Sequence, residues 1–188
     1  MVLVHGGLWE DMDAERFWVR AGVVAGLAGA GVEVVAPDRL PRPDSWAAEV
    51  RHLLGVLPEV PLTVVAGSNG CSVAVRLAVD HPDRVQRLVL AWPATAGDPR
   101  LDAWSRRQGV PEGMLVGETL RGVADAELAE LQMPVAIVPG DNLFHQRRTI
   151  EALLRVVRGS VELSACPEPP RPEFNPDDLV RALLSWNR

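Results

Sequence analysis

Short apolar runs alternate along this chain with longer stretches in which apolar residues recur at helical spacing. The runs predict buried strands, and the stretches between them predict amphipathic helices. We expect six strands, at Met1–Val4, Val32–Ala36, Leu62–Ala66, Val85–Ala91, Pro134–Val138 and Ser160–Leu163. We expect helices over Ala14–Gly29, Ser45–Leu57, Gly70–Asp80, His145–Val157 and from Pro176 onward. This alternation predicts an α/β protein with a doubly wound, mostly parallel sheet, strand order 2-1-3-4-5-6, covered by helices on both faces.

Residues 94–133 interrupt the alternation. They are polar, and their glycines recur with only short helical patterns between them. The segment therefore predicts short helices that cover the carboxyl edge of the sheet and make few contacts with the core. We interpret residues 1–188 as one domain in which 94–133 is a small lid-like insert.

One strand-to-helix junction carries a candidate nucleophile. Ser68 lies between Gly67 and Asn69-Gly70, after an apolar β-branched run and before apolar residues at helical spacing. A tight turn there would lift the hydroxyl clear of the sheet and point free helix N–H groups at an attacked group. The alternative is an ordinary glycine-containing loop, and the pentapeptide alone does not decide between them.

Composition narrows the function classes. The 188 residues carry a net charge of −6 and 47% hydrophobic residues, with no basic run, so we expect neither a nucleic-acid nor a membrane partner. Two cysteines and no signal-peptide pattern predict a reducing, cytoplasmic location. No metal or cofactor motif is visible. We expect a small-molecule substrate or ligand. The sequence leaves open whether the chain forms a homodimer.

Several motifs together resemble the α/β-hydrolase superfamily, in a compact form without its N-terminal edge strands. The motifs are His5-Gly6-Gly7, Pro37-Asp38-Arg39, Ala66-Gly67-Ser68-Asn69-Gly70, His81-Pro82-Asp83-Arg84-Val85 and the stretch Pro134–Asp141. Ala66 stands where the nucleophile elbow G-x-S-x-G has its first glycine. The resemblance covers nearly the whole chain.

The resemblance implies roles for particular residues. Ser68 would be the nucleophile, and the backbone N–H groups of Asn69 and of Gly7 or Leu8 would hold the developing oxyanion. We interpret His5 as an anchor that orients the glycines after it. The superfamily's catalytic base is a histidine on the loop after the last strand, and residues 165–173 contain none.

His145 is the candidate replacement for that base, and Asp141 is the candidate acid. Asp141 lies two residues before the position of the usual acid and is equally well interpreted as a turn or helix-capping residue. Strands two positions apart are separated by roughly 10 Å, so His145 reaches Ser68 only if its loop leans over the elbow. Asp98 is a weaker candidate acid. If His145 does not serve, Glu168 or Glu173 of the proline-rich loop is the alternative base.

Two functions follow from this incomplete set. The first is a serine hydrolase of a small, partly apolar ester, thioester or lactone, with an atypical triad. The second is a non-hydrolytic or impaired member of the fold that binds an apolar small molecule or catalyses a non-covalent reaction. For either one we expect a pocket lined by His5, Leu8, Trp9, Trp92 and Phe144 together with residues of the insert.

Overall fold

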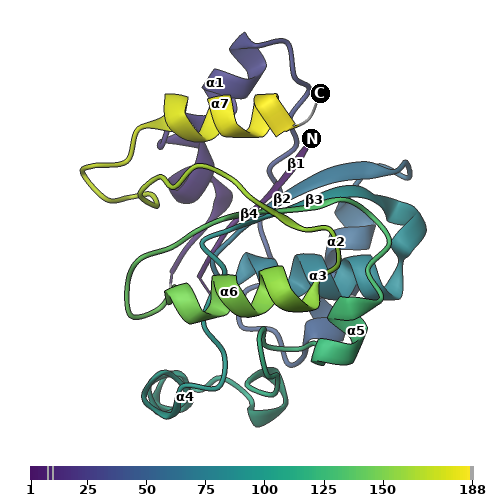
Figure 1. Ribbon diagram of the computed structural model, residues 1–188, viewed down its shortest axis with the longest axis vertical. Helices are drawn as coiled ribbons and strands as arrows, with labels where there is room; N and C mark the ends of the chain where they lie inside the picture. The colour runs from purple at the N-terminus through teal and green to yellow at the C-terminus, as the bar shows by residue number, and fades with distance from the viewer. Residues whose placement is uncertain (8, 10, 187–188) are drawn as a thin grey trace.

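The computed structural model describes residues 1–7, 9 and 11–186 (Figure 1). Its centre is a sheet of five parallel strands in the order β1-β2-β3-β4-β5. The strands are β1 (Val2–Val4), β2 (Leu62–Gly67), β3 (Val85–Ala91), β4 (Val135–Val138) and β5 (Val161–Glu162). Parallel strands carry their carboxyl ends to one edge, so the loops after β1, β2, β3 and β4 lie near one another.

The predicted strand Val32–Ala36 is reduced to a single bridge in which Val35 pairs in parallel with Val2. Leu3 N–H donates to the Val35 carbonyl at 2.9 Å, and Val35 N–H donates to the Met1 carbonyl at 2.9 Å. This bridge lies beside β1, so the order 2-1-3-4-5-6 is kept with its edge strand shortened. Proline at position 37 follows directly and cannot donate to a ladder, which limits the pairing.

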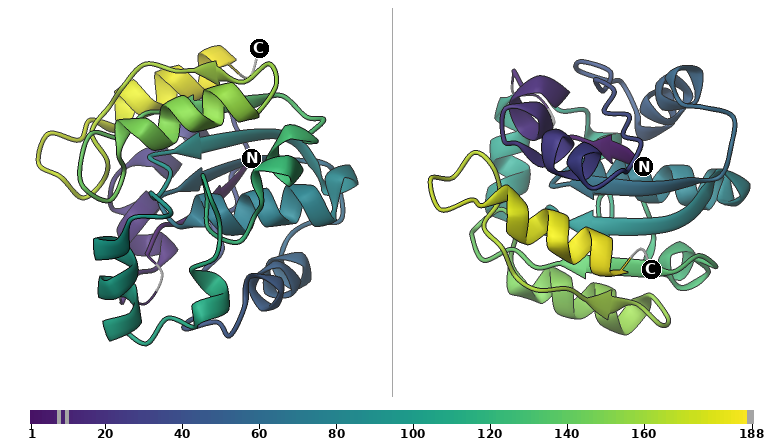
Figure 2. Two further views of the ribbon diagram at one scale, coloured as in Figure 1. Left: turned by 60° about the horizontal axis from the view of Figure 1, so that its bottom comes forward. Right: turned by 90° about the horizontal axis from the view of Figure 1, so that it is seen from above.

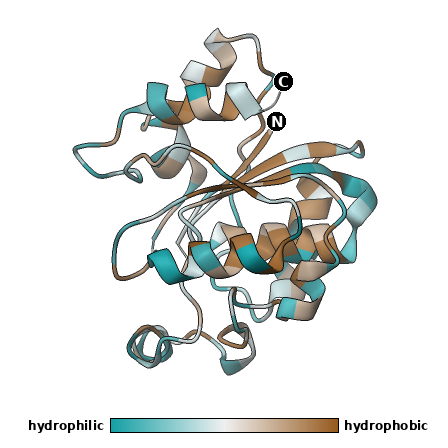
Figure 3. Ribbon diagram, in the orientation of Figure 1, coloured by the Kyte–Doolittle hydropathy of each residue, from teal (hydrophilic) through white to brown (hydrophobic). Residues whose placement is uncertain are grey.

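Helices cover both faces of the sheet. On one face lie η1 (Glu15–Val19), α1 (Val23–Gly29) and α7 (Pro176–Trp186), seen in front of the strands in Figure 2, right. The other face carries α2 (Trp46–Val56), α3 (Gly70–Asp80) and α6 (Arg147–Val156). The strand residues alternate between the two cores, which makes the strands hydrophobic along their length (Figure 3).

The predicted helix Ala14–Gly29 is divided in two. A π-helical turn, η1, ends at Val19, and α1 begins after Gly22, whose φ of 83° only glycine adopts without strain. The predicted helix from His145 begins instead at Arg147, so His145 lies on the loop before α6. No helix among the described residues is long and apolar enough to cross a membrane.

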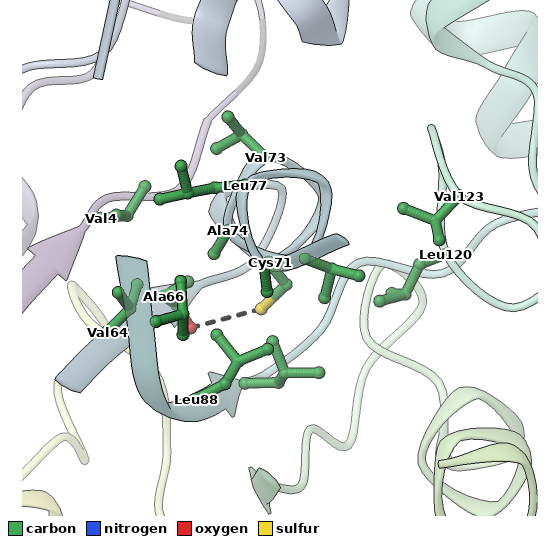
Figure 4. Close-up of a cluster of buried hydrophobic side chains, with 14 of the residues drawn as sticks. Val4, Val64, Ala66, Cys71, Val73, Ala74, Leu77, Leu88, Leu120 and Val123 are labelled. Carbon is green, nitrogen blue, oxygen red and sulfur yellow. Dashed lines mark hydrogen bonds between the residues drawn. The ribbon is translucent and has the colours of Figure 1, made fainter. Parts of the chain in front are cut away.

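The segment 94–133 holds α4 (Pro99–Arg107), η3 (Glu112–Met114) and α5 (Asp125–Ala129). The expectation of few core contacts is wrong. Its apolar residues join the core beside α2 and α3, and Figure 4 shows Leu120 and Val123 near Cys71 of α3. Most of the spaced large apolar residues of this mainly polar segment are buried, although Val116 is exposed, and a count of polar residues does not reveal this pattern. A lid motion of this segment stays a prediction.

Candidate active site

Ser68 lies on a sharp turn between β2 and α3. Its φ is 52°, a left-handed conformation that is uncommon for a residue with a side chain. The turn is held by Ser68 N–H, which donates to the Ala91 carbonyl at 2.9 Å. A Cβ on Gly67 would lie 2.6 Å from the Phe17 ring, and a Cβ on Gly70 would lie 2.5 Å from the His5 carbonyl oxygen. The glycines therefore allow two neighbouring segments to pass against the turn, which has the geometry expected of an elbow.

His145 reaches this serine. Its Nε2 lies 2.9 Å from Ser68 Oγ, a hydrogen-bond distance across 77 residues of sequence. The loop after β4 leans over the elbow because the loop after β3 holds it there. Thr95 N–H donates to the Phe144 carbonyl at 2.8 Å, and Gln146 N–H donates to Thr95 Oγ1 at 2.9 Å.

Gly140 completes the approach of this loop. A Cβ at Gly140 would lie 2.4 Å from the Cβ of His145, so the histidine backbone can fold back only over a glycine. The offset of about 10 Å expected between strands two apart is thereby closed by the loop and not by the side chain alone.

Glu168 is the carboxylate that contacts His145. Its Oε2 lies 2.6 Å from Nδ1, and both side chains are largely buried, with 7% of His145 and 18% of Glu168 exposed. The prediction of Asp141 as the acid partner is wrong. The Asp141 carboxylate is 80% exposed and pairs with Arg171 at 3.0 Å. It lies on the solvent side of its loop, where an arginine from the proline-rich loop compensates its charge.

The other candidate acid also lies elsewhere. Asp98 caps the first turn of α4 by accepting from Arg100 N–H at 3.0 Å, and it pairs with the Arg100 side chain. The hydrogen bonds from Arg100 hold the pKa of Asp98 well below its usual range. Asp98 is thus a helix-capping residue. Glu168, which the sequence offered only as an alternative base, is the carboxylate that contacts His145.

A cavity of about 210 Å³ lies in front of Ser68 and His145. Its walls include Leu101 and Trp104 from α4 and Phe144 from the loop after β4, and the Trp104 and Phe144 rings meet edge to face at 5.8 Å. Arg121 gives the cavity a polar end. Its guanidinium donates to Asp102 at 2.9 Å and to Ser105 at 3.1 Å, while its Nε is buried without a hydrogen-bond partner among the described residues.

Phe144 and residues of the insert, among them Leu101 and Trp104, line this cavity as expected, whereas the cavity lining does not include His5, Trp9 or Trp92. The prediction for Trp92 is wrong: it is 1% exposed, and its indole N–H donates to the Cys166 carbonyl at 2.8 Å. Trp9 lines a neighbouring cavity of about 570 Å³ instead. Leu8 lies outside the described residues.

His5 is a buried anchor, as the sequence suggested, and it is not a wall of the cavity. Its Nδ1 donates to the Gly6 carbonyl at 2.7 Å, and its Nε2 accepts from Arg39 N–H at 3.0 Å. Burial lowers the pKa of His5, so the ring that makes both hydrogen bonds is neutral.

Arg39 braces the same loop. It is paired with Glu49, and its guanidinium also donates to the carbonyls of His5 and Gly7. Gly7 and Asn69 both line the cavity beside Ser68, which is where oxyanion donors would have to lie. Their role as donors stays a prediction.

Among the described residues, no group of three or more histidine, cysteine, aspartate or glutamate side chains could hold a metal ion. The described part of the site therefore consists of a serine, a histidine and a carboxylate in a row, beside a small cavity. Such a row can move a proton from the serine hydroxyl to the imidazole while the carboxylate holds the ring.

Comparison with solved structures identifies the fold. The meta-cleavage product hydrolase of Pseudomonas fluorescens IP01 superposes with a TM-score of 0.75 and 18% identity, over 99% of this chain and 89% of that one. A serine hydrolase involved in carbazole degradation gives a TM-score of 0.74 and 19% identity, over 99% and 90%. This chain has the α/β-hydrolase fold. No family model matches it.

Comparison with curated protein sequences finds relatives of higher sequence identity. A 2-hydroxymuconate semialdehyde hydrolase of Pseudomonas sp. (strain CF600) is 34% identical over a match that covers 78% of this chain and 56% of the relative. The chain spans about half the length of the curated relatives it matches.

Compared with the arrangement that the resemblance implies, the histidine and the carboxylate beside Ser68 come from opposite loops. By the motifs above, the superfamily places its acid after the strand that corresponds to β4 and its histidine after the last strand. Here His145 follows β4, and Glu168 follows β5. The line of three side chains is kept because the two loops lie side by side at the carboxyl edge, so each can supply either group.

Proposed function

We propose that this protein is a serine hydrolase in which Ser68 is the nucleophile, His145 the general base and Glu168 the acid. The observation that carries the proposal is the unbroken chain of contacts, 2.9 Å from Ser68 to His145 and 2.6 Å from His145 to Glu168. A base must lie within about 3 Å of the proton that it removes, and a third group must hold it in the productive orientation.

The reaction follows from this geometry. Ser68 Oγ attacks an acyl carbon while its proton passes to Nε2 of His145. Glu168 stabilises the imidazolium that forms, without taking the proton. The imidazolium then gives the proton to the leaving group, which departs as the acyl–Ser68 bond is completed. A water molecule, deprotonated by His145, attacks the acyl group, and the acid product leaves with Ser68 regenerated.

The cavity supports a small, partly apolar acyl compound. A volume of about 210 Å³ fits only a few carbon atoms beyond the reacting group, and Leu101, Trp104 and Phe144 give it apolar walls. Arg121 lines the cavity, so its guanidinium would lie beside an acceptor oxygen of a bound substrate. Esters, thioesters and lactones of this size are candidates, and 2-hydroxymuconate semialdehyde, for which the relatives are named, belongs among the compounds to test.

The non-hydrolytic alternative rested on the absence of a histidine from the last loop. His145 at hydrogen-bond distance from Ser68 removes that reason, because the base comes from a different loop. No other feature of the described residues favours a purely binding function.

The test is labelling with a fluorophosphonate probe and turnover of p-nitrophenyl acetate. Wild type should react, and Ser68→Ala should not. His145→Ala should lower the rate by about 10²–10⁴-fold. Glu168→Gln should lower it by a factor within the same range, because the uncharged amide no longer stabilises the imidazolium.

A matched control is His52→Ala. His52 lies on α2, its ring forms a hydrogen bond with the Asp38 carbonyl, and it is not among the residues that line the cavity, so its loss should leave the rate unchanged. Labelling of wild type that survives His145→Ala would contradict the assignment of the base. No labelling of wild type, with the protein folded, would contradict the proposed function.

A further inference from the structure

Asn142 touches both the base and the acid of the proposed site. Its Nδ2 lies 2.8 Å from Glu168 Oε1 and 3.1 Å from His145 Nδ1. Its Oδ1 accepts hydrogen bonds from the backbone N–H groups of Phe144 at 2.8 Å and His145 at 3.0 Å. One side chain therefore joins the backbone that carries the histidine to the carboxylate that comes from a different loop.

A count of protons assigns these contacts. If Nε2 is to accept the proton of Ser68, then Nδ1 carries the hydrogen of the neutral ring and donates it to Glu168 Oε2 at 2.6 Å. Asn142 cannot donate to a nitrogen that already carries a hydrogen. Its N–H must therefore go to Glu168 Oε1, the carboxylate oxygen that His145 leaves free.

This arrangement holds the carboxylate in one orientation. Both oxygens of Glu168 then accept a hydrogen bond, one from the histidine and one from the amide, while the amide itself is fixed by two backbone donors. A group held at both oxygens cannot rotate away from Nδ1, so the ring keeps the tautomer that a general base needs. Loop 139–146 has no helical or strand structure that would fix His145 otherwise.

We propose that Asn142 is a positioning residue for the histidine–glutamate pair. We also propose that a carboxylate at position 142 would be able to replace Glu168 as the acid partner of His145. The inference rests on the proposed function of Ser68. Its basis is symmetry: the asparagine amide and the glutamate carboxylate both lie within 3.1 Å of Nδ1 and contact each other. An amide and a carboxylate have nearly the same shape, so the two groups can in principle exchange positions.

Other charged groups surround this pair and enter any pH profile. They are Arg171 and Asp141 on the two loops, Arg121 on the cavity wall, and Asp98 with Arg148 next to Gln146. Arg171 Nε lies 3.7 Å from Glu168 Oε1. None of these groups changes in the variants below, so a shift between variants reports the exchanged pair.

The experiment exchanges the two groups. Glu168→Gln, Asn142→Asp and the double variant Asn142→Asp/Glu168→Gln are compared with wild type by the pH dependence of kcat/KM for p-nitrophenyl acetate. Glu168→Gln should lose about 10²-fold or more. The double variant restores a carboxylate near Nδ1 and an amide beside it, and it should recover at least about tenfold over Glu168→Gln.

The single variant Asn142→Asp sets two carboxylates 2.8 Å apart, which favours protonation of the pair and of the ring beside it. The rising limb of its pH profile should move to higher pH by about half a unit or more. Asn175→Asp is the matched control, because it makes the same change of charge on an exposed loop residue whose side chain accepts from Asp177 N–H. It should leave the profile in place.

A second measurement does not depend on turnover. The proton on Nδ1 in the 2.6 Å contact should give a strongly downfield NMR signal in wild type, disappear in Glu168→Gln and return in the double variant. A double variant that folds but is no more active than Glu168→Gln, and shows no returned signal, overturns the inference. That result does not contradict the proposed function, provided that the fluorophosphonate probe labels wild type and does not label His145→Ala.

Discussion

The buried pair of Arg39 and Glu49 offers a test of how the loop behind the site is held. Their side chains are 3% and 1% exposed, and two hydrogen bonds join them, at 2.9 and 2.8 Å. Glu49→Leu removes the carboxylate and leaves a guanidinium buried without its counter-charge. Loss of one partner of a buried pair costs about 3–5 kcal/mol in the free energy of unfolding. For a chain of this size that corresponds to a Tm lower by about 6–20 °C.

The assay is urea unfolding followed by tryptophan fluorescence, with Tm measured in parallel. The double variant Arg39→Met/Glu49→Leu buries no charge and should be less destabilised than Glu49→Leu alone. Glu112→Leu is the control, because the pair of Glu112 with Arg106 is exposed and contributes at most about 1 kcal/mol. A cost for Glu49→Leu as small as that of the control would refute the reasoning.

Three further predictions concern the turn, the anchor and the thiols. Gly70→Ala should lower Tm and slow Ser68 labelling because its Cβ would lie 2.5 Å from a backbone oxygen, whereas Gly55→Ala, with open space around it, should raise stability by about 0.5–1 kcal/mol. Burial lowers the pKa of His5 below 6.5, so its contribution to the free energy of unfolding is complete above pH 6.5 and falls as the pH decreases. The free energy of unfolding should change by at most about 1.4 kcal/mol per pH unit through this group. His5→Gln should reduce that slope in urea titrations at pH 5 to 7. Burial raises the pKa of Cys166 to about 11, and both cysteines are free and buried, so iodoacetamide at pH 8 should modify them much more slowly in the native than in the unfolded protein; equal rates would contradict this.

The proposed base and acid come from the opposite loops to those of the superfamily, and this has a consequence for interpreting sequences of this fold. A search for a histidine after the last strand finds none here, and the chain then resembles an inactive member. The geometry requires only that the histidine lie between the serine and a carboxylate. Either of two adjacent loops can supply it when the loops meet at the same sheet edge.

The alternation of apolar runs and helical stretches was enough to predict the parallel sheet and the turn at Ser68. Both depend on local physics. Strand residues buried on two faces must be apolar along their length, and a serine between small residues, after such a run, can adopt the left-handed turn that was found at φ 52°. These preferences act over a few residues and are therefore visible in sequence.

The tertiary structure alone decided which residues meet Ser68. His145 is 77 residues away, and it arrives because Thr95, on a third loop, fixes its neighbours. Trp92 was expected in the pocket, but its φ of 48° accompanies a ring packed against Trp18 and Phe174. Hydrogen bonds between loops set the positions of the site residues, and a bond between distant loops leaves no periodic pattern in either segment. The sequence therefore identified candidate residues, and only the folded loops determined which of them lie together.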